Sequence, residues 1–321
     1  MKLSHIRDVL AVSESGSLRA AGRQLGIAQP AITRSIREIE HELGASLFER
    51  HPKGVRLTPI GEAFVRRAAV VQNELRRAKE EVEQLRGQDV GQVSVVMSIA
   101  ASIAILPRAL AAFRKAHPAA LLRVSEGLFQ PVERDIIDGR VDFYAGALNA
   151  PVSDPRLVVE RLFANQRLII ARTGHPLLQA SSIRELGAAS WLRPALTDRS
   201  SEADFADWLR EMGLPSPKIV MHTRSALQTV LAVAASDLLT VVPRQWLEIP
   251  ELAGRLEALA GIPPVSAAPV CMVRQSAIPL TPLAEKLSDI VRRIAGHYAR
   301  AHPIEATPPR VQAVRLERGS R

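Results

Sequence analysis

The side chains best suited to chemical recognition lie close together near the amino end of the chain. One predicted helix begins at Gln29 and presents Gln29, Pro30, Thr33 and Arg34 on its first turns. Glutamine can bond two atoms of adenine, arginine can do the same with guanine, and the carbons of proline or threonine can contact the methyl group of thymine. Such a helix suits the DNA major groove, although each residue taken singly also suits a solvated surface.

The flanking residues predict the rest of a helix-turn-helix. Apolar residues at helical spacing predict a first helix over residues 3–13. Ser17 can cap a short second helix by accepting a hydrogen bond from a free backbone N–H, and Gly26 allows the tight turn that follows. Pro30 is tolerated in the first turn of the third helix, where its missing N–H costs nothing, and Gly44 ends that helix.

Residues 50–57 predict a small β-wing after these helices. His51, Lys53 and Arg56 surround Gly54 in this stretch, and basic residues on a wing can reach phosphates or a minor groove. Arg56 is equally suited to a solvated position.

A long helix is expected from Pro59, with Thr58 as its cap. Its apolar residues recur in alternating steps of four and three, at Phe64, Ala68, Val71, Leu75, Ala78, Val82 and Leu85. This heptad seam predicts self-association through the helix, and the alternative is a surface helix packed on its own domain. Gly87 and Gly91 mark a hinge after it.

Beyond Gly91, predicted strands and helices alternate. The first half has strands over 92–99, 121–126 and 141–147 and helices over 102–116 and 131–138. The second half has strands over 168–171, 218–222 and 239–242, helices over 202–212 and 225–234, a returning strand over 268–274 and a closing helix over 282–298. This order predicts two similar α/β halves with a mostly parallel sheet. Ligands favour the carboxyl ends of the strands in such sheets, so we expect a ligand cleft between the halves.

The composition narrows the class of protein. The 321 residues are 47% hydrophobic and carry a net charge of +9, which suits a soluble globular protein with an anionic partner such as nucleic acid. The single cysteine, Cys271, lies in an apolar run and is expected to be a small buried hydrophobe in a reducing cytoplasm. We find no signal peptide and no run of about 20 apolar residues, so no membrane partner is expected.

Motifs for catalysis are missing from the sequence. We find no H-E-x-x-H, no G-x-S-x-G, no Walker loop and no G-x-G-x-x-G after a strand, and the histidines are scattered. We therefore expect no enzymatic activity, no metal and no cofactor.

Three segments in order resemble the winged helix-turn-helix of the LysR-type transcriptional regulators. They are Gly16-Ser17-Leu18-Arg19-Ala20-Ala21, Gln29-Pro30-Ala31-Ile32-Thr33, and Leu47-Phe48-Glu49-Arg50 leading to Leu57-Thr58-Pro59-Ile60-Gly61. The resemblance covers the whole chain and implies four parts. These are an all-α winged helix-turn-helix DNA-binding domain at 1–58, a linker helix for dimerisation at 59–87, an α/β effector-binding domain of two Rossmann-like lobes, similar to periplasmic binding proteins, at 88–302, and a basic, disordered tail at 303–321.

Within that family, the segments 77–87 and 236–240 resemble regulators of aromatic sulfonate or carboxylate catabolism. The resemblance implies DNA contacts by Gln29, Pro30, Thr33, Arg34, Arg37, Arg50, Lys53 and Arg56. Arg50 is equally suited to an ion pair with Glu40 or Glu42. One departure is Ala28, where the family usually has Ser or Thr that can cap the recognition helix.

The resemblance also implies an effector site between the lobes. On the first lobe it involves Ser98, Ala100, Ala101 and Ser102, where hydroxyl and free N–H groups at a helix start suit a carboxylate or sulfonate, and Phe129 and Gln130 as an aromatic wall and an amide. On the second lobe it involves Thr197, Arg199, Ser200, Ser201, Thr223, Arg224 and Ser225. Both arginines are equally suited to a solvated surface, and His222 is better explained as a structural histidine.

These observations lead to one main hypothesis and one alternative. The main one is a regulator that binds an inverted repeat in double-stranded DNA and responds to a small anionic aromatic effector. The resemblance implies a homodimer through the linker helix, assembled further into a homotetramer that contacts RNA polymerase. The alternative is a small-molecule binding protein without sequence-specific DNA binding, which the two α/β halves alone would permit.

Overall fold

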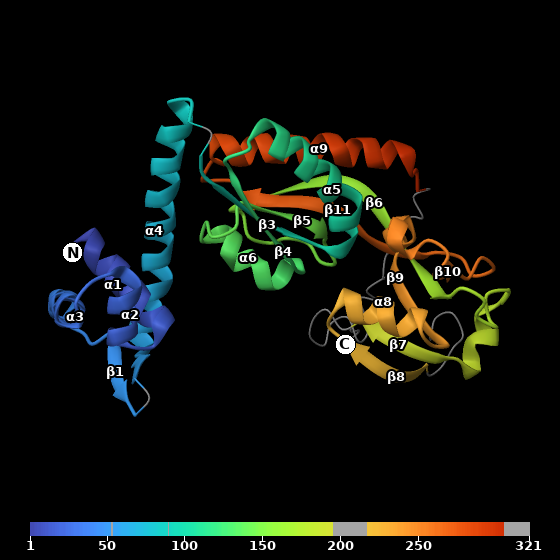
Figure 1. Ribbon diagram of the computed structural model, residues 1–321, viewed down its shortest axis with the longest axis horizontal. Helices are drawn as coiled ribbons and strands as arrows, with labels where there is room; N and C mark the ends of the chain where they lie inside the picture. The colour runs from blue at the N-terminus through green and yellow to red at the C-terminus, as the bar shows by residue number, and fades with distance from the viewer. Residues whose placement is uncertain (53, 89, 195–216, 305–321) are drawn as a thin grey trace, which may run out of the picture.

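The structure is a computed structural model that describes residues 1–52, 54–88, 90–194 and 217–304. Figure 1 shows a small amino-terminal domain, a long helix α4 and an α/β domain of two lobes. The amino-terminal domain packs on one half of α4, and the other half stands beside the first lobe, lobe I. The expected tail, Thr197, Arg199, Ser200, Ser201, Lys53 and the predicted helix over 202–212 lie outside the described residues, apart from residues 303 and 304 of the tail.

The amino-terminal domain has the predicted helix-turn-helix and wing. It contains α1 (Leu3–Ser15), α2 (Leu18–Leu25), α3 (Gln29–Leu43) and an antiparallel pair of strands, β1 (Phe48–His51) and β2 (Gly54–Leu57). The Ser17 hydroxyl accepts a hydrogen bond from the Ala20 N–H at 3.4 Å, and Gly26 has a φ of 67° that glycine adopts without strain. The core holds Val9, Val12, Ala21, Ile32, Ile36, Ile39 and Leu47.

Helix α4 (Pro59–Leu85) begins where the sequence predicts. The Thr58 hydroxyl caps it by accepting from the Gly61 N–H at 3.0 Å. A Cβ at Gly61 would lie 2.0 Å from the carbonyl oxygen of Leu47, so the helix approaches the core as closely as only glycine allows. Ala68 then packs against Ile6 and Leu10 of α1, which fixes the domain to the helix.

Lobe I contains a parallel triplet of strands between two layers of helices. The strands lie in the order β4 (Leu121–Glu126), β3 (Gln92–Met97) and β5 (Phe143–Ala147), followed by the antiparallel strands β11 (Val265–Gln275) and β6 (Leu157–Arg172). Helices α5 (Ile99–Ala116) and α9 (Pro282–Ala301) cover one face, with Phe113, Phe163 and Tyr298 in the core. Helix α6 (Phe129–Ile137) covers the other face.

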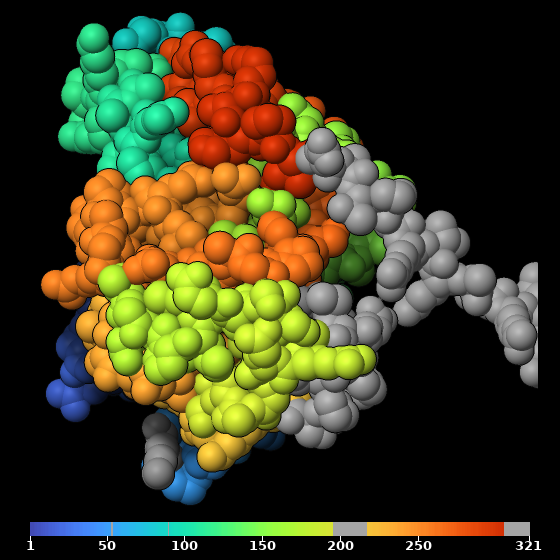
Figure 2. Space-filling view, turned by 90° about the vertical axis from the view of Figure 1, so that its right-hand side faces the viewer, coloured from blue at the N-terminus to red at the C-terminus, as the bar shows by residue number. Residues whose placement is uncertain are grey.

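Lobe II repeats this plan. Its parallel triplet lies in the order β8 (Lys218–Thr223), β7 (Ser190–Pro194) and β9 (Leu238–Pro243), and β6 is antiparallel to both β9 and β10 (Leu256–Ala258). Helix α8 (Ala226–Ala234) and the 3₁₀ helix η2 (Arg244–Glu248) contribute to the core on one face, and η1 (Ile183–Ala188) to the core on the other. A short 3₁₀ helix, η3 (Pro250–Leu252), follows η2. Figure 2 shows the molecule from this end, with the red surface of α9 above lobe II.

The structure corrects three predictions about this domain. The sheet is parallel only within the two triplets, because β6 and β11 run through both lobes and pair antiparallel with their neighbours. The first parallel strand of lobe II is β7, which the sequence analysis missed, and residues 168–171 are the end of β6 instead. Helix α5 begins at Ile99, three positions before the predicted start, because Ser98 caps it.

In the described part of the chain, every helix is too short or too polar to cross a bilayer.

Candidate DNA-binding surface and ligand cavity

The first turns of α3 form an exposed surface of mixed chemistry. Gln29, Pro30, Thr33, Arg34 and Arg37 line one groove on this helix, together with Glu38 and His41. The hydroxyl of Thr33 donates to the Gln29 carbonyl at 3.0 Å, which leaves its methyl group for apolar contact. The surface therefore offers an amide, guanidinium groups and small apolar groups, the combination that base edges in the major groove require.

Several contacts hold α3 in place behind this surface. His5 of α1 lies 3.3 Å from Glu38, and the amino terminus of Met1 forms an ion pair with Glu42. The Glu40 carboxylate accepts from the backbone N–H groups of Leu47 and Phe48 at 2.7 and 3.1 Å, which joins α3 to the start of the wing. The recognition helix is thus tied to both α1 and β1.

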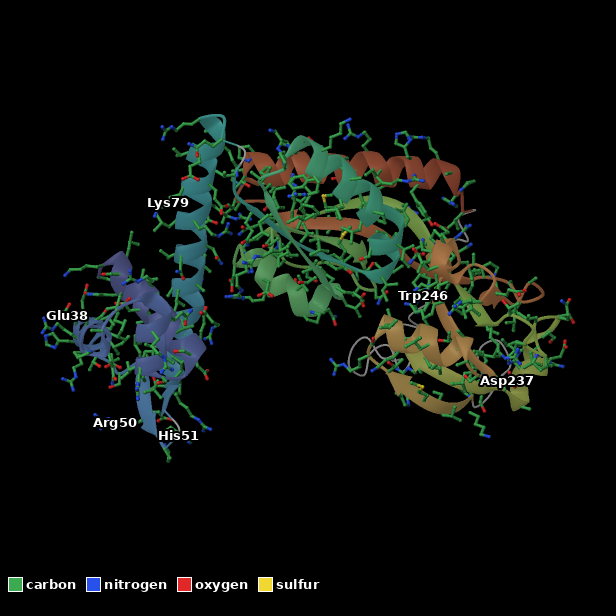
Figure 3. All side chains as sticks on the ribbon, viewed as in Figure 1. Glu38, Arg50, His51, Lys79, Asp237 and Trp246 are labelled. Atoms are coloured by element: carbon green, nitrogen blue, oxygen red, sulfur yellow. The ribbon has the colours of Figure 1, made fainter. Side chains whose placement is uncertain are left out.

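The wing is fixed to the domain through its backbone. Val55 N–H donates to the Gly16 carbonyl at 2.9 Å, and a Cβ at Gly54 would lie 2.3 Å from that oxygen. Arg50 and Arg56 are exposed, and Figure 3 shows Arg50 and His51 on the wing. The Glu40 carboxylate bonds the backbone and the Glu42 carboxylate bonds Met1, so neither of these described contacts is the ion pair with Arg50 that the sequence allowed.

A cavity of about 130 Å³ lies where the two lobes meet. Its walls are Ser98, Ile99, Ala100, Leu128, Ala147, Asn149, Asn165, Arg167, Arg193, Pro194, Ala226, Thr229, Val241, Val242, Pro243 and Trp246. Ser98 directly follows β3, and Ala147 is the last residue of β5. Arg193 and Val242 lie at the carboxyl ends of β7 and β9. Each of these strand pairs is the point in its triplet where the strand order reverses, which is where open α/β sheets bind ligands.

The cavity combines positive charge with an aromatic wall. Arg167 and Arg193 supply two guanidinium groups, and Arg193 is only 5% exposed. Trp246, 3% exposed, lies at the junction of the lobes (Figure 3). Its indole N–H and the Asn165 side-chain oxygen are buried without a hydrogen-bond partner in the described part of the chain. Buried polar atoms usually have partners, so these two atoms are available to a ligand.

The structure brings only part of the expected effector site to this cavity. Ser98 and Ala100 line it, and Ser98 also caps α5 by accepting from the Ala101 N–H at 3.4 Å. Ala101 and Ser102 belong to the same first turn of α5 but are not among the residues that line the cavity.

The expected aromatic wall lies elsewhere. Phe129 is buried in the lobe I core, with its ring centroid 5.6 Å from that of Tyr144, and Gln130 is exposed. Phe129 and Gln130 are outside the described lining, because α6 begins at Phe129 and turns this side chain toward the sheet. Trp246 occupies the position of an aromatic wall instead.

The three residues expected to contact the effector around position 224 instead lie at the start of helix α8, where two of them stabilise its first turn. The Thr223 hydroxyl donates to the Gln228 side chain at 2.6 Å, and the Ser225 hydroxyl caps α8 by accepting from the Gln228 N–H at 3.4 Å. Arg224 is exposed. All three residues are outside the described lining of the cavity.

Two buried groups on strands β5 and β11 are held in their neutral form. Burial raises the pKa of the Tyr144 phenol, which donates to the Ala147 carbonyl at 3.1 Å. Burial likewise raises the pKa of the Cys271 thiol, as expected of a structural cysteine.

A winged helix-turn-helix joined through a long helix to a two-lobed domain with a cavity defines a DNA-binding regulator with an effector-binding domain. Residues 3–62 match the family model described as a bacterial regulatory helix-turn-helix protein of the lysR family, and residues 86–295 match the LysR substrate binding domain. The chain belongs to the LysR family of transcriptional regulators, as the resemblance predicted.

Known relatives support the same assignment over most of the chain. The HTH-type transcriptional regulator GbpR of Azospirillum brasilense is 27% identical over 255 residues, which cover 78% of this chain and 73% of GbpR. The SDS degradation transcriptional activation protein of Pseudomonas sp. (strain ATCC 19151) is 25% identical over 291 residues, 90% of this chain and 95% of that protein. The crystal structure of full-length CbnR complexed with its target DNA has the same fold, with a TM-score of 0.65 at 19% identity over 92% of this chain and 100% of CbnR.

Proposed function

We propose that this regulator binds an inverted-repeat operator as a dimer and responds to a small anionic effector, an aromatic carboxylate or sulfonate. The observation that carries the DNA-binding part is the exposed groove on α3 formed by Gln29, Pro30, Thr33 and Arg34. CbnR, which shares the fold, was crystallised with its target DNA.

The exposed seam of α4 supports a dimer. Val71, Val82 and Leu85 are 45%, 56% and 74% exposed, although they belong to a regular heptad pattern. A groove between α1 and α4, which Leu3, Ile6 and Leu75 help to line, lies next to this seam. A second copy of α4 would bury these side chains. Two winged domains related by a twofold axis require an inverted repeat in the DNA.

Assembly into a tetramer and contact with RNA polymerase extend this proposal. Both rest on the family resemblance, and the dimer through α4 is the unit from which the tetramer would be built.

The size and chemistry of the cavity support a single-ring anion. An engineered cavity of about 150 Å³ holds benzene, so a cavity of about 130 Å³ suits one ring. Trp246 can pack against that ring, and Arg193 and Arg167 can meet a carboxylate or sulfonate with bidentate hydrogen bonds.

The DNA-binding proposal is tested by substitutions on the groove and the wing. Arg34→Ala should cost about 1–3 kcal/mol of discrimination at one base position. Arg56→Ala on the exposed wing should weaken binding to all sequences alike and lower the slope of log affinity against log salt by about 1. Footprinting titrations on the DNA upstream of the gene measure both. Equal affinity of the unchanged protein for every duplex would contradict the proposal.

The effector proposal is tested by thermal shift with benzoate and benzenesulfonate. A ligand at about 100 times its Kd should stabilise the protein by about 2.7 kcal/mol. Arg193→Gln should abolish that shift, whereas Arg172→Gln, which removes an arginine paired with Asp237 away from the cavity, should keep it. A shift that survives Arg193→Gln would place the ligand elsewhere.

A further inference from the structure

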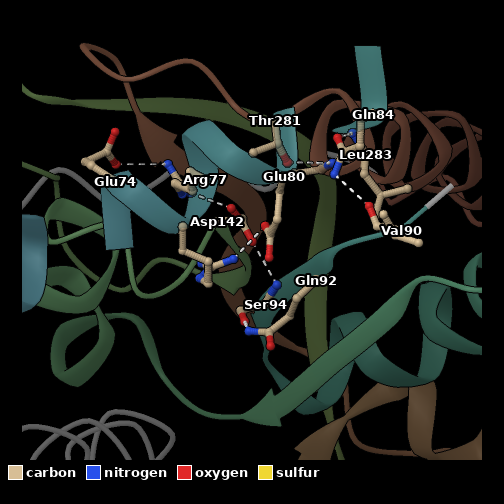
Figure 4. Close-up of polar contacts among 12 residues, drawn as sticks. Glu74, Arg77, Glu80, Gln84, Val90, Gln92, Ser94, Asp142, Thr281 and Leu283 are labelled. Carbon is tan, nitrogen blue, oxygen red and sulfur yellow. Dashed lines mark hydrogen bonds and ion pairs between the residues drawn. The ribbon is translucent and has the colours of Figure 1, made fainter. Parts of the chain in front are cut away.

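One buried carboxylate of lobe I shows how polar atoms in a protein interior are normally paired. Asp142 is 5% exposed, and its two oxygens accept from Arg77 and from the Ser94 N–H, the latter at 2.8 Å (Figure 4). Leaving such an atom without a partner costs free energy, so unpaired buried polar atoms are uncommon. Those that line a cavity are therefore informative about what the cavity binds.

Two residues that line the cavity between the lobes each bury an unpaired polar atom. They are Asn165, through its side-chain oxygen, and Trp246, through its indole N–H, and neither atom has a partner in the described part of the chain. Since Asn165 is only 6% exposed and Trp246 only 3%, bulk water does not replace the missing partners. The Asn165 oxygen needs a donor and the Trp246 N–H needs an acceptor.

The anionic group of an aromatic acid can satisfy only one of these two atoms. A carboxylate or sulfonate oxygen can accept from the Trp246 N–H, but an ionised acid has no hydrogen to donate to Asn165. A hydroxyl group can do both, because its O–H donates and its oxygen accepts. A ring without such a substituent would leave the Asn165 oxygen buried and unpaired.

The cavity wall separates the site of the anion from the site of this second polar group. Asn165 and Arg167 are two positions apart on β6, so they lie on the same face of the strand, with their Cα atoms about 6.6 Å apart along it. A group bonded to Asn165 and an anion bonded to Arg167 are thus expected on different atoms of one ring. The apolar side chains of Ile99, Val241 and Pro243 also line the cavity and suit the ring carbons.

We propose that the effector is a hydroxylated aromatic acid, with a ring hydroxyl that donates to the Asn165 oxygen, while the Trp246 N–H donates to an oxygen of the ligand. This inference rests on the proposed effector function of the same cavity and adds the chemical class of the ring substituent. Arg167 and Arg193 attract any aromatic acid, whereas Asn165 selects the hydroxylated ones. Sites built to bond a hydroxyl reject analogues that lack it, because their buried polar atoms are then left unpaired.

The test compares the dissociation constants of matched aromatic acids for the full-length protein by isothermal titration calorimetry. The hydroxyl donor is present in 3- and 4-hydroxybenzoate, the corresponding methoxybenzoates keep the oxygen without its hydrogen, and benzoate lacks both. We expect one hydroxybenzoate to bind at least about tenfold more tightly than benzoate and than its methoxy counterpart.

The substitution Asn165→Leu removes the acceptor and keeps a side chain of similar size. It should bring the ratio between the dissociation constants of benzoate and the preferred hydroxybenzoate close to one. Gln275→Leu is the matched control, because Gln275 also buries a side-chain oxygen without a described partner but lies outside the lining of the cavity. This control should keep the ratio of the parent. Circular dichroism and thermal melting establish that both variants are folded.

The outcomes separate this proposal from the effector function on which it rests. If the parent binds none of these acids, both are overturned. If the parent binds benzoate and the hydroxybenzoates equally, the effector function stands and the hydroxyl proposal falls, and ordered water becomes the partner of the two buried atoms. A preference for hydroxybenzoate that persists in folded Asn165→Leu would overturn the role of Asn165.

Discussion

The candidate DNA-binding surface and the ligand cavity differ in one respect, which is whether the same side chains serve both folding and binding. On α3, Ile32, Ile36 and Ile39 form the core while Gln29 and Arg34 face solvent, so the side chains that fold the domain differ from those proposed to contact DNA. In the cavity, the side chains proposed to bind the effector also form part of the core.

Trp246 illustrates the second arrangement. It lines the cavity and also packs in a cluster that includes Ile99 of lobe I and Leu192 of lobe II. We therefore expect substitutions on the exposed face of α3 to change DNA affinity at constant stability, and substitutions in the cavity to change ligand affinity and stability together.

The largest effect is expected from Trp246→Ala. Removing this buried ring leaves a hole between the lobes, and such substitutions typically cost about 3–5 kcal/mol of unfolding free energy. Denaturant titration measures the loss. Trp246→Phe keeps most of the packing but not the indole N–H, and should cost less stability while still weakening ligand binding. Unchanged stability in Trp246→Ala would show that the cavity wall does not support the fold.

A smaller effect is expected from Glu40→Ala. This substitution tests whether the residues of α3 that stabilise the fold are separate from those that determine DNA affinity. Glu40 lies on the recognition helix yet bonds the N–H groups of Leu47 and Phe48 at the start of the wing. Leaving these donors unpaired should cost about 1–3 kcal/mol, and DNA affinity should fall because the wing shifts. Calorimetric melting and DNA titration measure the two losses. The exposed Glu49→Ala serves as control, and a loss of DNA affinity without a loss of stability would place Glu40 at the DNA itself.

The same contrast explains how much the sequence predicts. The helix-turn-helix follows from local signals, namely the Ser17 cap, the glycines with positive φ and the helical spacing of apolar residues, and these contacts lie close in sequence. The alternation of strands and helices predicts the two α/β halves, and the family match confirms the effector-binding domain that the resemblance implies.

The cavity is harder to predict because its residues meet only in three dimensions. The sequence does not point to Arg193, because the short strand β7, Ser190–Pro194, has little alternation and residues 168–171 fit the pattern of a first parallel strand of lobe II. Had β7 been placed, the rule that ligands bind at carboxyl ends of parallel strands would have pointed to Arg193. Trp246 follows β9 in a 3₁₀ turn that no periodicity marks.

The smallest effect, and the only gain, is expected from Ala28→Ser. Ala28 is the residue before α3, with an extended backbone at φ −61° and ψ 137°, and its methyl group cannot accept a hydrogen bond from the first turn. A serine hydroxyl there can cap the helix and should add about 0.5–2 kcal/mol of stability. Ser17→Ala, which removes the cap of α2, should produce a loss of similar size.

Thermal melting and DNA titration of Ala28→Ser together sharpen the comparison. Stability should rise while base preference stays the same, because the substitution lies beside the groove formed by Gln29 and Arg34 and leaves both side chains in place. Uniformly tighter binding to all DNA sequences would indicate that the new hydroxyl contacts a phosphate. A changed base preference would instead mean that the start of α3 shifts when capped, and that folding and binding are as closely joined on this helix as they are in the cavity.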